Sequence, residues 1–414
     1  METATLLKSL NIMSVRDLHL QNKRVLVRAD FNVPLDDQGV IGDDSRIRAT
    51  LPTIDFIRKA EARLILCSHL GRPKGKKGPK YSLEPVARRL AELLDCEVMV
   101  PDDCIGDAAI HLIANQRPGQ IVLLENLRYH DGEEANSEDF ARKLADLCDV
   151  YICDAFGCVH RAHASVSALP KMVPVRGAGL LLEKELEVLG KLMSSPEAPY
   201  VALLGGAKVS DKIEVIESLL PLVHGLVIGG AMAYTFLTAQ GFDMGKSLVE
   251  KDHLGLAKHL LGRCDEKGLP VLLPVDHIVV KEIKADAPFT IKKNGELEPD
   301  DIAVDIGPET IKLFENLLAG THPSLPQPPR TVLWNGPMGI FEMDAFANGT
   351  MAVAQAVAHS TAYSVVGGGD SVAAVQKAGV TPMIRHISTG GGASLEYLSG
   401  LPMPGVQALR GGRR

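Results

Sequence analysis

The stretch YSVVGGGDS, from Tyr363 to Ser371, is the best single indication of the fold. A β-branched run ends in three glycines, and an alanine-rich helical pattern follows, so the stretch predicts a strand, a tight turn and a helix start. Glycines lack a Cβ atom and let backbone N–H groups approach a phosphate, and a helix N-terminus carries partial positive charge. Taken by itself, the stretch is compatible with a structural turn and with a phosphate-binding loop.

Three other parts of the chain repeat this arrangement of glycines after an apolar run. Glycine pairs at 205–206 and 229–230 follow apolar pairs, and a glycine triplet at 390–392 follows another short run. The repetition favours phosphate binding, because each loop would bring backbone N–H groups to the end of a strand. The sequence therefore indicates a chain that binds anions at its strand ends.

The remaining pattern predicts an α/β fold. In the first half, strands over Arg24–Arg28 and Arg63–Cys67 enclose a helix over Arg48–Lys59, and residues 82–94 predict a further helix with Ser82 as its N-cap. A second alternating series fills the second half, with an excursion of β-strands between Asp276 and Lys293. Such alternation predicts two doubly wound, Rossmann-like parallel sheets, each covered by helices on both faces, with ligands beyond the carboxyl ends of the strands.

The length and the breaker residues predict how the chain is divided. At 414 residues the chain exceeds a typical single core, and prolines and glycines cluster at 170–179 and at 195–199. One alternative is that the helix between these clusters is a further packing helix of a single larger domain. The predicted parts are a first lobe over 1–175, a hinge and interdomain helix over 176–199, a second lobe over 200–392, and a C-terminal segment over 393–414 that packs back on the first lobe.

The composition is that of an ordinary globular protein, with 46% hydrophobic and 23% charged residues. The net charge of −7 argues against binding to nucleic acid or to an anionic membrane surface. No run of apolar residues is long enough to span a bilayer, and residues 1–15 do not form a signal peptide. Seven cysteines, an odd number, favour a reducing, cytoplasmic setting. Three of them, Cys148, Cys153 and Cys158, are expected to be buried rather than to bind metal.

Basic residues follow several of the predicted strands of the first half. Because the carboxyl ends of parallel strands lie at one edge of a sheet, these side chains are expected to converge. Any one arginine is better explained as a solvated surface charge, but five of them after strand ends in an acidic protein indicate a site for a phosphate or carboxylate. The expected cluster consists of Arg28, Arg46, Arg72, Arg128 and Arg161, together with His69 and His163.

The second half supplies lysines and an acid beside its glycine loops. Lys208 and Lys212 are four residues apart at a predicted helix start, so they are expected to share a helix face and to reach one polyphosphate. A solvated helix face is the alternative explanation. Asp370 suits a metal ion, and the chain has no evident nucleophile with an adjacent base. This set of residues fits phosphoryl transfer, in which the protein positions the reactants and neutralises charge.

Eight motifs in this order resemble the phosphoglycerate kinase family, and the resemblance covers essentially the whole chain. They are RVLVRADFNVP (24–34), SHLGRP (68–73), ENLR (125–128), DAFG with HRAH (154–157 and 160–163), GGAKVSDK (205–212), WNGPMGIFE (334–342), GGGDS (367–371) and STGGGASLE (388–396). The resemblance implies transfer of a phosphoryl group between ATP and 3-phosphoglycerate, giving ADP and 1,3-bisphosphoglycerate, with Mg²⁺ as cofactor. It also implies a monomer. The acceptor is a carboxylate that is already ionised at neutral pH, so no general base is needed.

The resemblance implies a triose site on the first lobe. Asp30 and Asn32 would bind the glycerate hydroxyl and carboxyl region, and Arg46 would stabilise the phosphoryl group in transfer. The non-transferred phosphate would be held by His69, Arg72, Arg128 and Arg161. The remaining substrate-binding residues would be Arg28, Phe31, Leu70 and Gly71.

The resemblance implies a nucleotide site on the second lobe. Lys208 would stabilise the moving phosphoryl group from the nucleotide side, Lys212 would bind the nucleotide phosphates, and Glu342 would bind the ribose. Asp370 would ligate Mg²⁺. The other nucleotide-binding residues would be Gly206, Gly230, Gly307, Asn335, Pro337, Gly368, Gly369 and Ser371, and a catalytic contribution would come from Gly368 and Gly391.

One departure from the family pattern lies close to the predicted triose site. Cys158-Val159 stands where the family usually has Thr-Ala, so a substrate contact through that hydroxyl is absent here. Two other interpretations remain open at this point. The first is a catalytically silent anion-binding protein, and the second is another ATP-dependent acyl-phosphate or sugar kinase. A nicotinamide enzyme is disfavoured, because no G-x-G-x-x-G sequence follows a strand.

Overall fold

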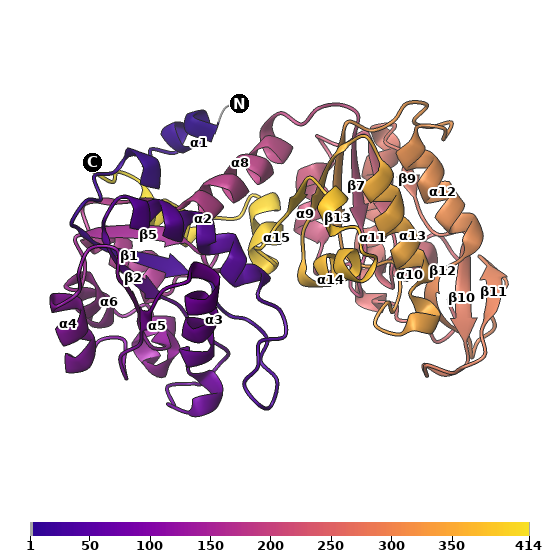
Figure 1. Ribbon diagram of the computed structural model, residues 1–414. Helices are drawn as coiled ribbons and strands as arrows, with labels where there is room; N and C mark the ends of the chain where they lie inside the picture. Colours follow the sequence, from indigo (N-terminus) through magenta and orange to yellow (C-terminus); the bar gives the residue numbers. More distant parts are fainter. Residues whose placement is uncertain (1–2, 414) are drawn as a thin grey trace. The chain divides into compact units, whose positions relative to one another are not determined.

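The structure is a computed structural model that describes residues 3–413. The ends predicted for the first lobe at residue 1 and for the C-terminal segment at residue 414 lie outside the described residues. The chain divides into two compact units (Figure 1). The first unit takes the chain up to Gly190 and resumes at Leu401, and the second unit is Lys191–Gly400. The last residues of the chain therefore belong to the first unit.

A six-stranded parallel sheet forms the centre of the first unit, in the order β3-β4-β2-β1-β5-β6. Its strands are β1 (Arg24–Ala29), β2 (Arg63–Cys67), β3 (Val98–Met99), β4 (Ile121–Leu123), β5 (Val150–Asp154) and β6 (Arg176–Ala178). All five residues of β5 are buried, as are the last four of β2. Burial on both faces explains why these strands are continuous apolar runs.

Helices cover this sheet. They are α1 (Thr3–Ser9), α2 (Ser45–Lys59), α3 (Glu84–Leu94), α4 (Asp107–Ala114), α5 (Asp131–Glu134), α6 (Glu138–Ala145), α7 (Leu169–Met172), α8 (Leu180–Ser194) and α16 (Pro404–Leu409). Ile54 and Ile57 of α2 are fully buried in one cluster with Val25 and Val27 of β1. This packing fixes α2 against the central strand, and α2 carries one of the predicted arginines.

The second unit has its own six-stranded parallel sheet, in the order β15-β14-β13-β7-β8-β9. Its strands are β7 (Tyr200–Leu204), β8 (Gly225–Ile228), β9 (Val271–Leu272), β13 (Thr331–Asn335), β14 (Tyr363–Val366) and β15 (His386–Ile387). Its helices are α9 (Ile213–Leu219), α10 (Met232–Ala239), α11 (Leu254–Glu266), α12 (Pro308–Ala319), α13 (Asn348–His359), α14 (Gly369–Lys377) and α15 (Gly392–Leu398). Helices α12 and α13 lie side by side (Figure 1) and bury Phe314 and Val357 in one core with Trp334. The predicted α/β fold is therefore confirmed in both units.

The predicted excursion of β-strands is a three-stranded antiparallel sheet in the second unit. Its strands are β10 (Asp276–Val280), β11 (Thr290–Lys293) and β12 (Ile302–Ile306), in the order β11-β10-β12. The first two strands were expected from the sequence. The third, β12, was not, because it is separated from its partner by a polar loop.

The predicted N-cap of α3 is one residue away from the observed one. The helix begins at Glu84 and Leu83 occupies the N-cap position, while the Ser82 hydroxyl accepts the backbone N–H of Glu84 at 3.2 Å. The Ser82 hydroxyl donates a hydrogen bond to Glu125 at 2.6 Å, and the same carboxylate oxygen accepts from the backbone N–H of Leu83 at 3.0 Å. Glu125 is distant in sequence, so local capping preference could not reveal this contact.

Close contact between backbones at the carboxyl edge of the second sheet generates a stability prediction. A Cβ atom at Gly205 would lie 2.2 Å from the carbonyl oxygen of Pro337, which belongs to the backbone and cannot turn away. We expect Gly205→Ala to lower the free energy of unfolding of the second unit by at least about 2 kcal/mol. Urea unfolding followed by the fluorescence of Trp334, the only tryptophan and a buried one, measures this unit.

The matched control for this measurement is Gly262→Ala. Gly262 lies inside α11, and a Cβ atom there would have no neighbour within 4 Å. This change should raise the free energy of unfolding by about 0.5–1 kcal/mol, because alanine is the better helix former. Equal unfolding midpoints for the two variants would contradict the packing argument.

Candidate functional site

In the first unit, the strand order reverses between β1 and β5. The chain passes from β1 to β2 on one side and later returns to β5 on the other side of β1. Loops that leave two such strands diverge, and α/β sheets bind ligands in the resulting crevice. The loop after β1 begins at Asp30 and the loop after β2 begins at Ser68, so both loops start at this edge.

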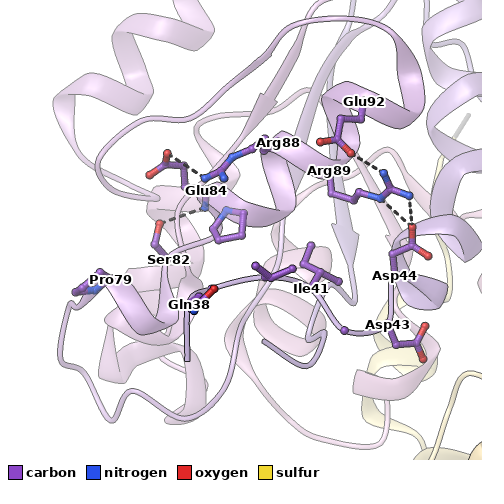
Figure 2. A pocket seen from close by; sticks show the side chains of 14 residues that line it. Gln38, Ile41, Asp43, Asp44, Pro79, Ser82, Glu84, Arg88, Arg89 and Glu92 are labelled. Atoms are coloured by element: carbon purple, nitrogen blue, oxygen red, sulfur yellow. Dashed lines mark hydrogen bonds and ion pairs between the residues drawn. The ribbon is translucent and has the colours of Figure 1, made fainter. Parts of the chain in front are cut away.

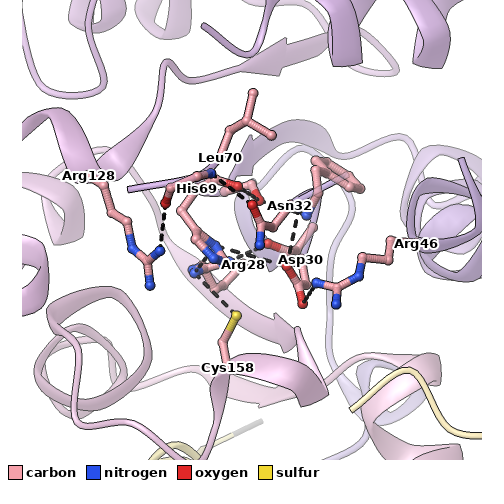
Figure 3. A network of polar contacts seen from close by, with 12 residues as sticks. Arg28, Asp30, Asn32, Arg46, His69, Leu70, Arg128 and Cys158 are labelled. Atoms are coloured by element: carbon pink, nitrogen blue, oxygen red, sulfur yellow. Dashed lines mark hydrogen bonds and ion pairs between the residues drawn. The ribbon is translucent and has the colours of Figure 1, made fainter. Parts of the chain in front are cut away.

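Polar contacts tie these two loops and the start of α2 together (Figure 3). Arg46, the second residue of α2, donates from Nη1 to Oδ2 of Asp30 at 2.7 Å. Asn32 accepts the backbone N–H of Gly71 on Oδ1 at 2.8 Å. The structure thus brings together four predicted site residues from three separate segments.

Arg28 lies at the end of β1 and is almost fully buried, with 1% of its surface exposed. Its Nε donates to the Ser165 hydroxyl at 2.8 Å, and its Nη2 lies 3.2 Å from Nδ1 of His69 and 3.6 Å from Sγ of Cys158 (Figure 3). Its Nη1 donates to the carbonyl oxygen of Ala29. Arg28 is therefore shielded from solvent, and it influences the crevice mainly through the residues that it contacts.

The other predicted arginines differ in their exposure. Arg128 is 5% exposed, and its Nη1 donates to the carbonyl oxygen of Gly71 at 2.7 Å while Nε pairs with Glu134 at 3.2 Å. The buried arginines are thus held by several contacts, whereas Arg72 and Arg161 are exposed and Arg161 donates from Nε to Nε2 of the neighbouring His160 at 3.0 Å.

Two histidines lie within this positive cluster. Burial lowers the pKa of His69 well below its usual value, and the charges of Arg28 and Arg128 lower it further. Burial also lowers the pKa of His163 to about 4, with Arg128 as the next cause. Both rings are therefore neutral at neutral pH. The positive charge of this cluster therefore comes from the arginines, and a bound anion would balance that charge.

Two predicted substrate-binding residues can offer only their backbones. Phe31 is fully buried and Leu70 is 3% exposed, and both side chains belong to the core of the first unit. The N–H of Phe31 is already donated to the Ser68 hydroxyl at 2.8 Å. These residues therefore shape the loops, and their side chains cannot select a ligand.

Two cavities flank the loop that precedes α2. The larger, about 760 Å³, lies between residues 38–44 and α3 (Figure 2), and the charges that line it pair with each other. Arg89 binds Asp44 at 2.8 Å, and Asp44 immediately precedes α2, so this pair anchors the start of the helix that carries Arg46. The smaller cavity, about 470 Å³, is bordered by Asn32 and adjoins the polar cluster.

The sequence did not reveal two buried polar residues, Glu133 and Ser165. Both are fully buried, and Ser165 accepts a hydrogen bond from Arg28. No sequence motif marks them, because the contacts join segments more than thirty residues apart. The expected burial of the evenly spaced cysteines is confirmed, since Cys153 is fully buried and the other two are at most 7% exposed.

In the second unit, the strand order reverses between β7 and β13. The N–H of Gly205 donates to the carbonyl oxygen of Asn335 at 2.9 Å, and the N–H of Gly206 donates to that of Pro337 at 2.9 Å. Gly230, from the loop after β8, has a φ of +66°, and a Cβ atom there would lie 2.6 Å from backbone atoms of Gly206. Two of the predicted glycine loops therefore meet at this edge, beside the segment that follows β13.

The loop from Gly367 to Ser371 is held by side chains beneath it. Asn335 donates from Nδ2 to the carbonyl oxygen of Gly367 at 2.7 Å, and the Ser371 hydroxyl accepts the N–H of Gly336 at 2.6 Å. Gly368 has a φ of +93°, which favours glycine. Ser371 is fully buried, so its hydroxyl braces the loop from inside.

The helical argument that linked Lys208 with Lys212 is wrong. Helix α9 begins at Ile213, and Lys208 lies in the irregular segment before it. Glu250 holds this segment in a turn, because its carboxylate accepts both the hydroxyl and the N–H of Ser210, at 2.6 and 3.0 Å. Lys208 is exposed, whereas Lys212 is 8% exposed. Burial lowers the pKa of Lys212 to about 8, against the charges of Asp211 and Asp370.

The remaining predicted nucleotide-site residues lie on several elements of the second unit. Gly307 is the N-cap residue of α12, and a Cβ atom there would lie 2.3 Å from the carboxylate of Asp276. Glu342 and Gly369 are exposed. Gly391, with a φ of +54°, precedes α15. Glu342 lies in the loop after β13. It is farther along the sequence from the end of that strand than the predicted glycines are from the strands that they follow.

Asp370 has the properties of a ligand for a hard cation. It lies in the first turn of α14, its side chain is exposed, and its carboxylate forms no ion pair with any residue between 3 and 413. Mg²⁺ prefers oxygen ligands and commonly uses one or two carboxylates together with phosphates and water. The donor set at this loop, a carboxylate beside an anion-binding backbone, therefore fits Mg²⁺.

The chain is similar to characterised proteins along nearly its whole length. The family model for phosphoglycerate kinase matches residues 15–401. The chain is 55% identical to the phosphoglycerate kinase of Acidobacterium capsulatum over 406 residues, covering 96% of this chain and 98% of the relative. Its fold matches the phosphoglycerate kinase of Coxiella burnetii with a TM-score of 0.85 at 42% identity, and that of Pyrococcus horikoshii with a TM-score of 0.82 at 34% identity. Each structural match covers 96% of this chain and 98% of the other.

The lowered pKa of Lys212 generates a prediction about pH. The ammonium group is charged below about pH 8 and loses its charge above it. If Lys212 binds nucleotide phosphates, the affinity for ADP should fall about tenfold between about pH 7 and pH 9.5, because one charge-assisted contact is lost. Isothermal titration calorimetry with Mg²⁺ present measures this fall.

Two variants make the titration specific to one residue. Lys212→Arg should flatten the pH profile, since a guanidinium stays charged throughout this range. Lys208→Arg leaves Lys212 in place and should keep the original profile. A profile that is already flat in the unmodified chain, or one that Lys212→Arg leaves unchanged, would exclude Lys212 as the titrating contact.

Proposed function

The chain belongs to the phosphoglycerate kinase family, and on that premise we propose that its two polar clusters bind the two substrates of one reaction. The chain is a phosphotransferase of glycolysis, and it transfers a phosphoryl group reversibly between 1,3-bisphosphoglycerate and ADP, giving 3-phosphoglycerate and ATP. We assign the triose to the first unit and the nucleotide to the second. The observation that carries this assignment is the set of arginines around the neutral ring of His69.

In the first unit, the exposed and the buried groups take different roles. Arg72 and Arg161 are exposed and would close on the non-transferred phosphate, while Arg128 and His69 form the fixed part of its site. Asp30 and Asn32, which tie the loops together, would bind the glycerate hydroxyl and carboxyl region. Arg28, Phe31, Leu70 and Gly71 would shape the site from behind.

In the second unit, backbone N–H groups of the glycine loops would hold the nucleotide phosphates. Lys212 would add a fixed charge and Lys208 a mobile one, because the first is buried and the second exposed. Glu342 would accept the ribose hydroxyls. The remaining contacts would come from Gly206, Gly230, Gly307, Asn335, Pro337, Gly368, Gly369 and Gly391, with Ser371 bracing the loop.

We assign Asp370 to Mg²⁺ that arrives with the nucleotide. The metal ion would neutralise charge on the phosphate oxygens when it is bound. Lys212 lies close enough to Asp370 for the two charges to interact. The protein's own contribution is therefore a carboxylate on the surface of the loop and an ammonium group buried beside it.

The reaction needs positive charge more than it needs a base. The acceptor carboxylate is ionised at neutral pH, so the site requires no proton acceptor. Asp30 holds Nη1 of Arg46 at 2.7 Å, and the other guanidinium donors of Arg46 have no hydrogen bond to the described residues. These donors are available to the phosphoryl group in transfer. Charge that is positioned before the reaction stabilises the transition state without reorganisation.

Because the substrates are assigned to separate units, we propose that the units approach each other when both are bound. Helix α8 (Leu180–Ser194) passes residue 190, where the two units divide, and is the candidate for a hinge. Approach would exclude water that hydrolyses the acyl phosphate. Small-angle scattering would detect it as compaction that requires both substrates.

The remaining proposals concern the setting of the protein. We propose a cytoplasmic monomer whose partners are small molecules, in keeping with the negative charge and the unpaired cysteines. Among residues 3–413, none of the helices is both long and apolar enough to cross a bilayer.

A coupled assay with 3-phosphoglycerate, ATP and Mg²⁺ tests the proposed function directly. Turnover that requires all three components supports it. Binding of both ligands without turnover would instead indicate a silent anion-binding protein. Activity with a different acceptor and none with 3-phosphoglycerate would indicate another acyl-phosphate or sugar kinase.

The role of Arg46 generates a prediction about catalysis. Arg46→Ala should lower kcat at least about a hundredfold, since one arginine at the transition state of other phosphoryl transfers contributes about 10³–10⁵. The affinity for ADP should change little, because the nucleotide site is assigned to the other unit. Arg58→Ala, at the opposite end of the same helix, is the control and should keep a normal kcat. A near-normal kcat in Arg46→Ala would remove Arg46 from catalysis.

A further inference from the structure

The ring of His69 has a defined hydrogen-bonding partner on one side. Nη2 of Arg28 lies 3.2 Å from Nδ1 of His69 (Figure 3). An arginine side chain has only donors and does not lose its proton in proteins. Nδ1 must therefore accept this hydrogen bond. A neutral imidazole that accepts at Nδ1 carries its proton at Nε2.

Within residues 3–413, the only hydrogen bond of Nδ1 is the one with Arg28. The nearest carboxylate oxygen, Oδ1 of Asp30, is 4.0 Å away, which is too long for a hydrogen bond. Asp30 is instead engaged by Arg46 at 2.7 Å. His69 is 5% exposed, so water has little access to compete with Arg28. The protonation pattern of the ring thus depends on where the Arg28 guanidinium is held.

A chain of buried contacts holds that guanidinium. Nε of Arg28 donates to the Ser165 hydroxyl at 2.8 Å, and that hydroxyl donates to Oε1 of Glu133 at 2.6 Å. The backbone N–H of Ser165 donates to Oε2 of the same carboxylate at 2.9 Å. Glu133 and Ser165 are fully buried, and Arg28 is 1% exposed.

The hydrogen-bond directions agree along this series of contacts, from Arg28 through Ser165 to Glu133. Ser165 accepts from Arg28 and donates to Glu133, so its single proton is committed to the carboxylate. Glu133 also supplies the negative charge that a buried guanidinium needs, because a buried charge without a partner is costly. Loss of the hydroxyl would leave Nε without its acceptor, so that the guanidinium would be held only through Nη1 and Nη2, by the carbonyl oxygen of Ala29 and Sγ of Cys158, and could turn about these contacts.

We propose that Glu133 and Ser165 are positioning residues that act through Arg28 to keep His69 as an Nε2–H donor toward the anionic substrate. The identity of that substrate as a phosphorylated triose rests on the proposed function. The inference about the ring does not, because it concerns the free protein. The assignment also gives Arg28 a role that suits its burial.

Nuclear magnetic resonance measures the tautomer of the His69 ring directly. Two-bond ¹⁵N–¹H correlation spectra of the ¹⁵N-histidine-labelled full chain distinguish a nitrogen that bears a proton from one that accepts. The chain has 13 histidines, and a His69→Gln variant identifies the His69 signals. In the unmodified chain we expect an Nε2–H tautomer near neutral pH. An Nδ1–H tautomer, or a ring that is mainly charged, would overturn the proposal.

Ser165→Ala tests the chain of contacts, with Ser167→Ala as its matched control. Ser167 lies two residues further in the same helical segment, is also buried, and is not in the chain of contacts to Arg28. We expect Ser165→Ala to yield a mixture of His69 tautomers and to raise KM for 3-phosphoglycerate about tenfold, with kcat changed less than about threefold. Ser167→Ala should match the unmodified chain in both measurements.

Glu133→Gln removes the charge and replaces one of the two acceptor oxygens with an amide donor. If the amide oxygen accepts the Ser165 hydroxyl, the amide nitrogen faces the backbone N–H of Ser165 that Oε2 accepts in the unmodified chain. This variant should therefore also disturb the position of Arg28, with a mixture of His69 tautomers and a raised KM for 3-phosphoglycerate. Identical behaviour of Ser165→Ala and Ser167→Ala would overturn the proposal. If the unmodified chain has the Nε2–H tautomer but no kinase activity, the proposed function fails and the inference about the ring stands. If Ser165→Ala does not fold, the tautomer of His69 in the unmodified chain still tests the proposal.

Discussion

The structure depends on parallel strand pairing with a reversal of strand order in each unit. The reversals lie between β1 and β5 and between β7 and β13. Parallel pairing places every carboxyl end at one edge, and the reversal makes neighbouring loops diverge there. The first edge gathers arginines and the second gathers glycines. The same topological constraint therefore positions both of the candidate anion sites that we propose.

Burial decides how the charges at these edges behave. Burial opposes the charge of Arg28, the Glu133 carboxylate behind it is one of the groups that offset this cost, and the charge of Arg28 helps to keep His69 neutral. Lys212 is buried with less compensation, and its pKa falls to about 8. Arg46, in contrast, is partly exposed and held by one carboxylate. Under the function we propose, the buried charges would prepare each site and the accessible ones would contact the phosphoryl group.

Patterns that are local in sequence were predicted, and contacts between distant segments were not. The alternation of strands and helices predicted both parallel sheets, and the polar residues and glycines after the strands predicted which groups lie at the edges of those sheets. The prediction that Lys208 shares a helix face with Lys212 was wrong, because Glu250 stabilises a turn before α9. The start of α3 was predicted one residue early, and the contact of Ser82 with the distant Glu125 was not predicted at all. No sequence motif pointed to Glu133 and Ser165, since their contact forms only when the chain is folded.

We propose that each substrate is bound by its own unit, and ligand binding to the Asp370→Asn variant separates the two units. Asp370 lies on the second unit, at the loop assigned to the metal-bound nucleotide. Calorimetry with Mg-ADP and, separately, with 3-phosphoglycerate measures both sites in one variant. We expect Mg-ADP to bind at least about tenfold more weakly and the affinity for 3-phosphoglycerate to be unchanged. Loss of 3-phosphoglycerate binding in this variant would contradict the division.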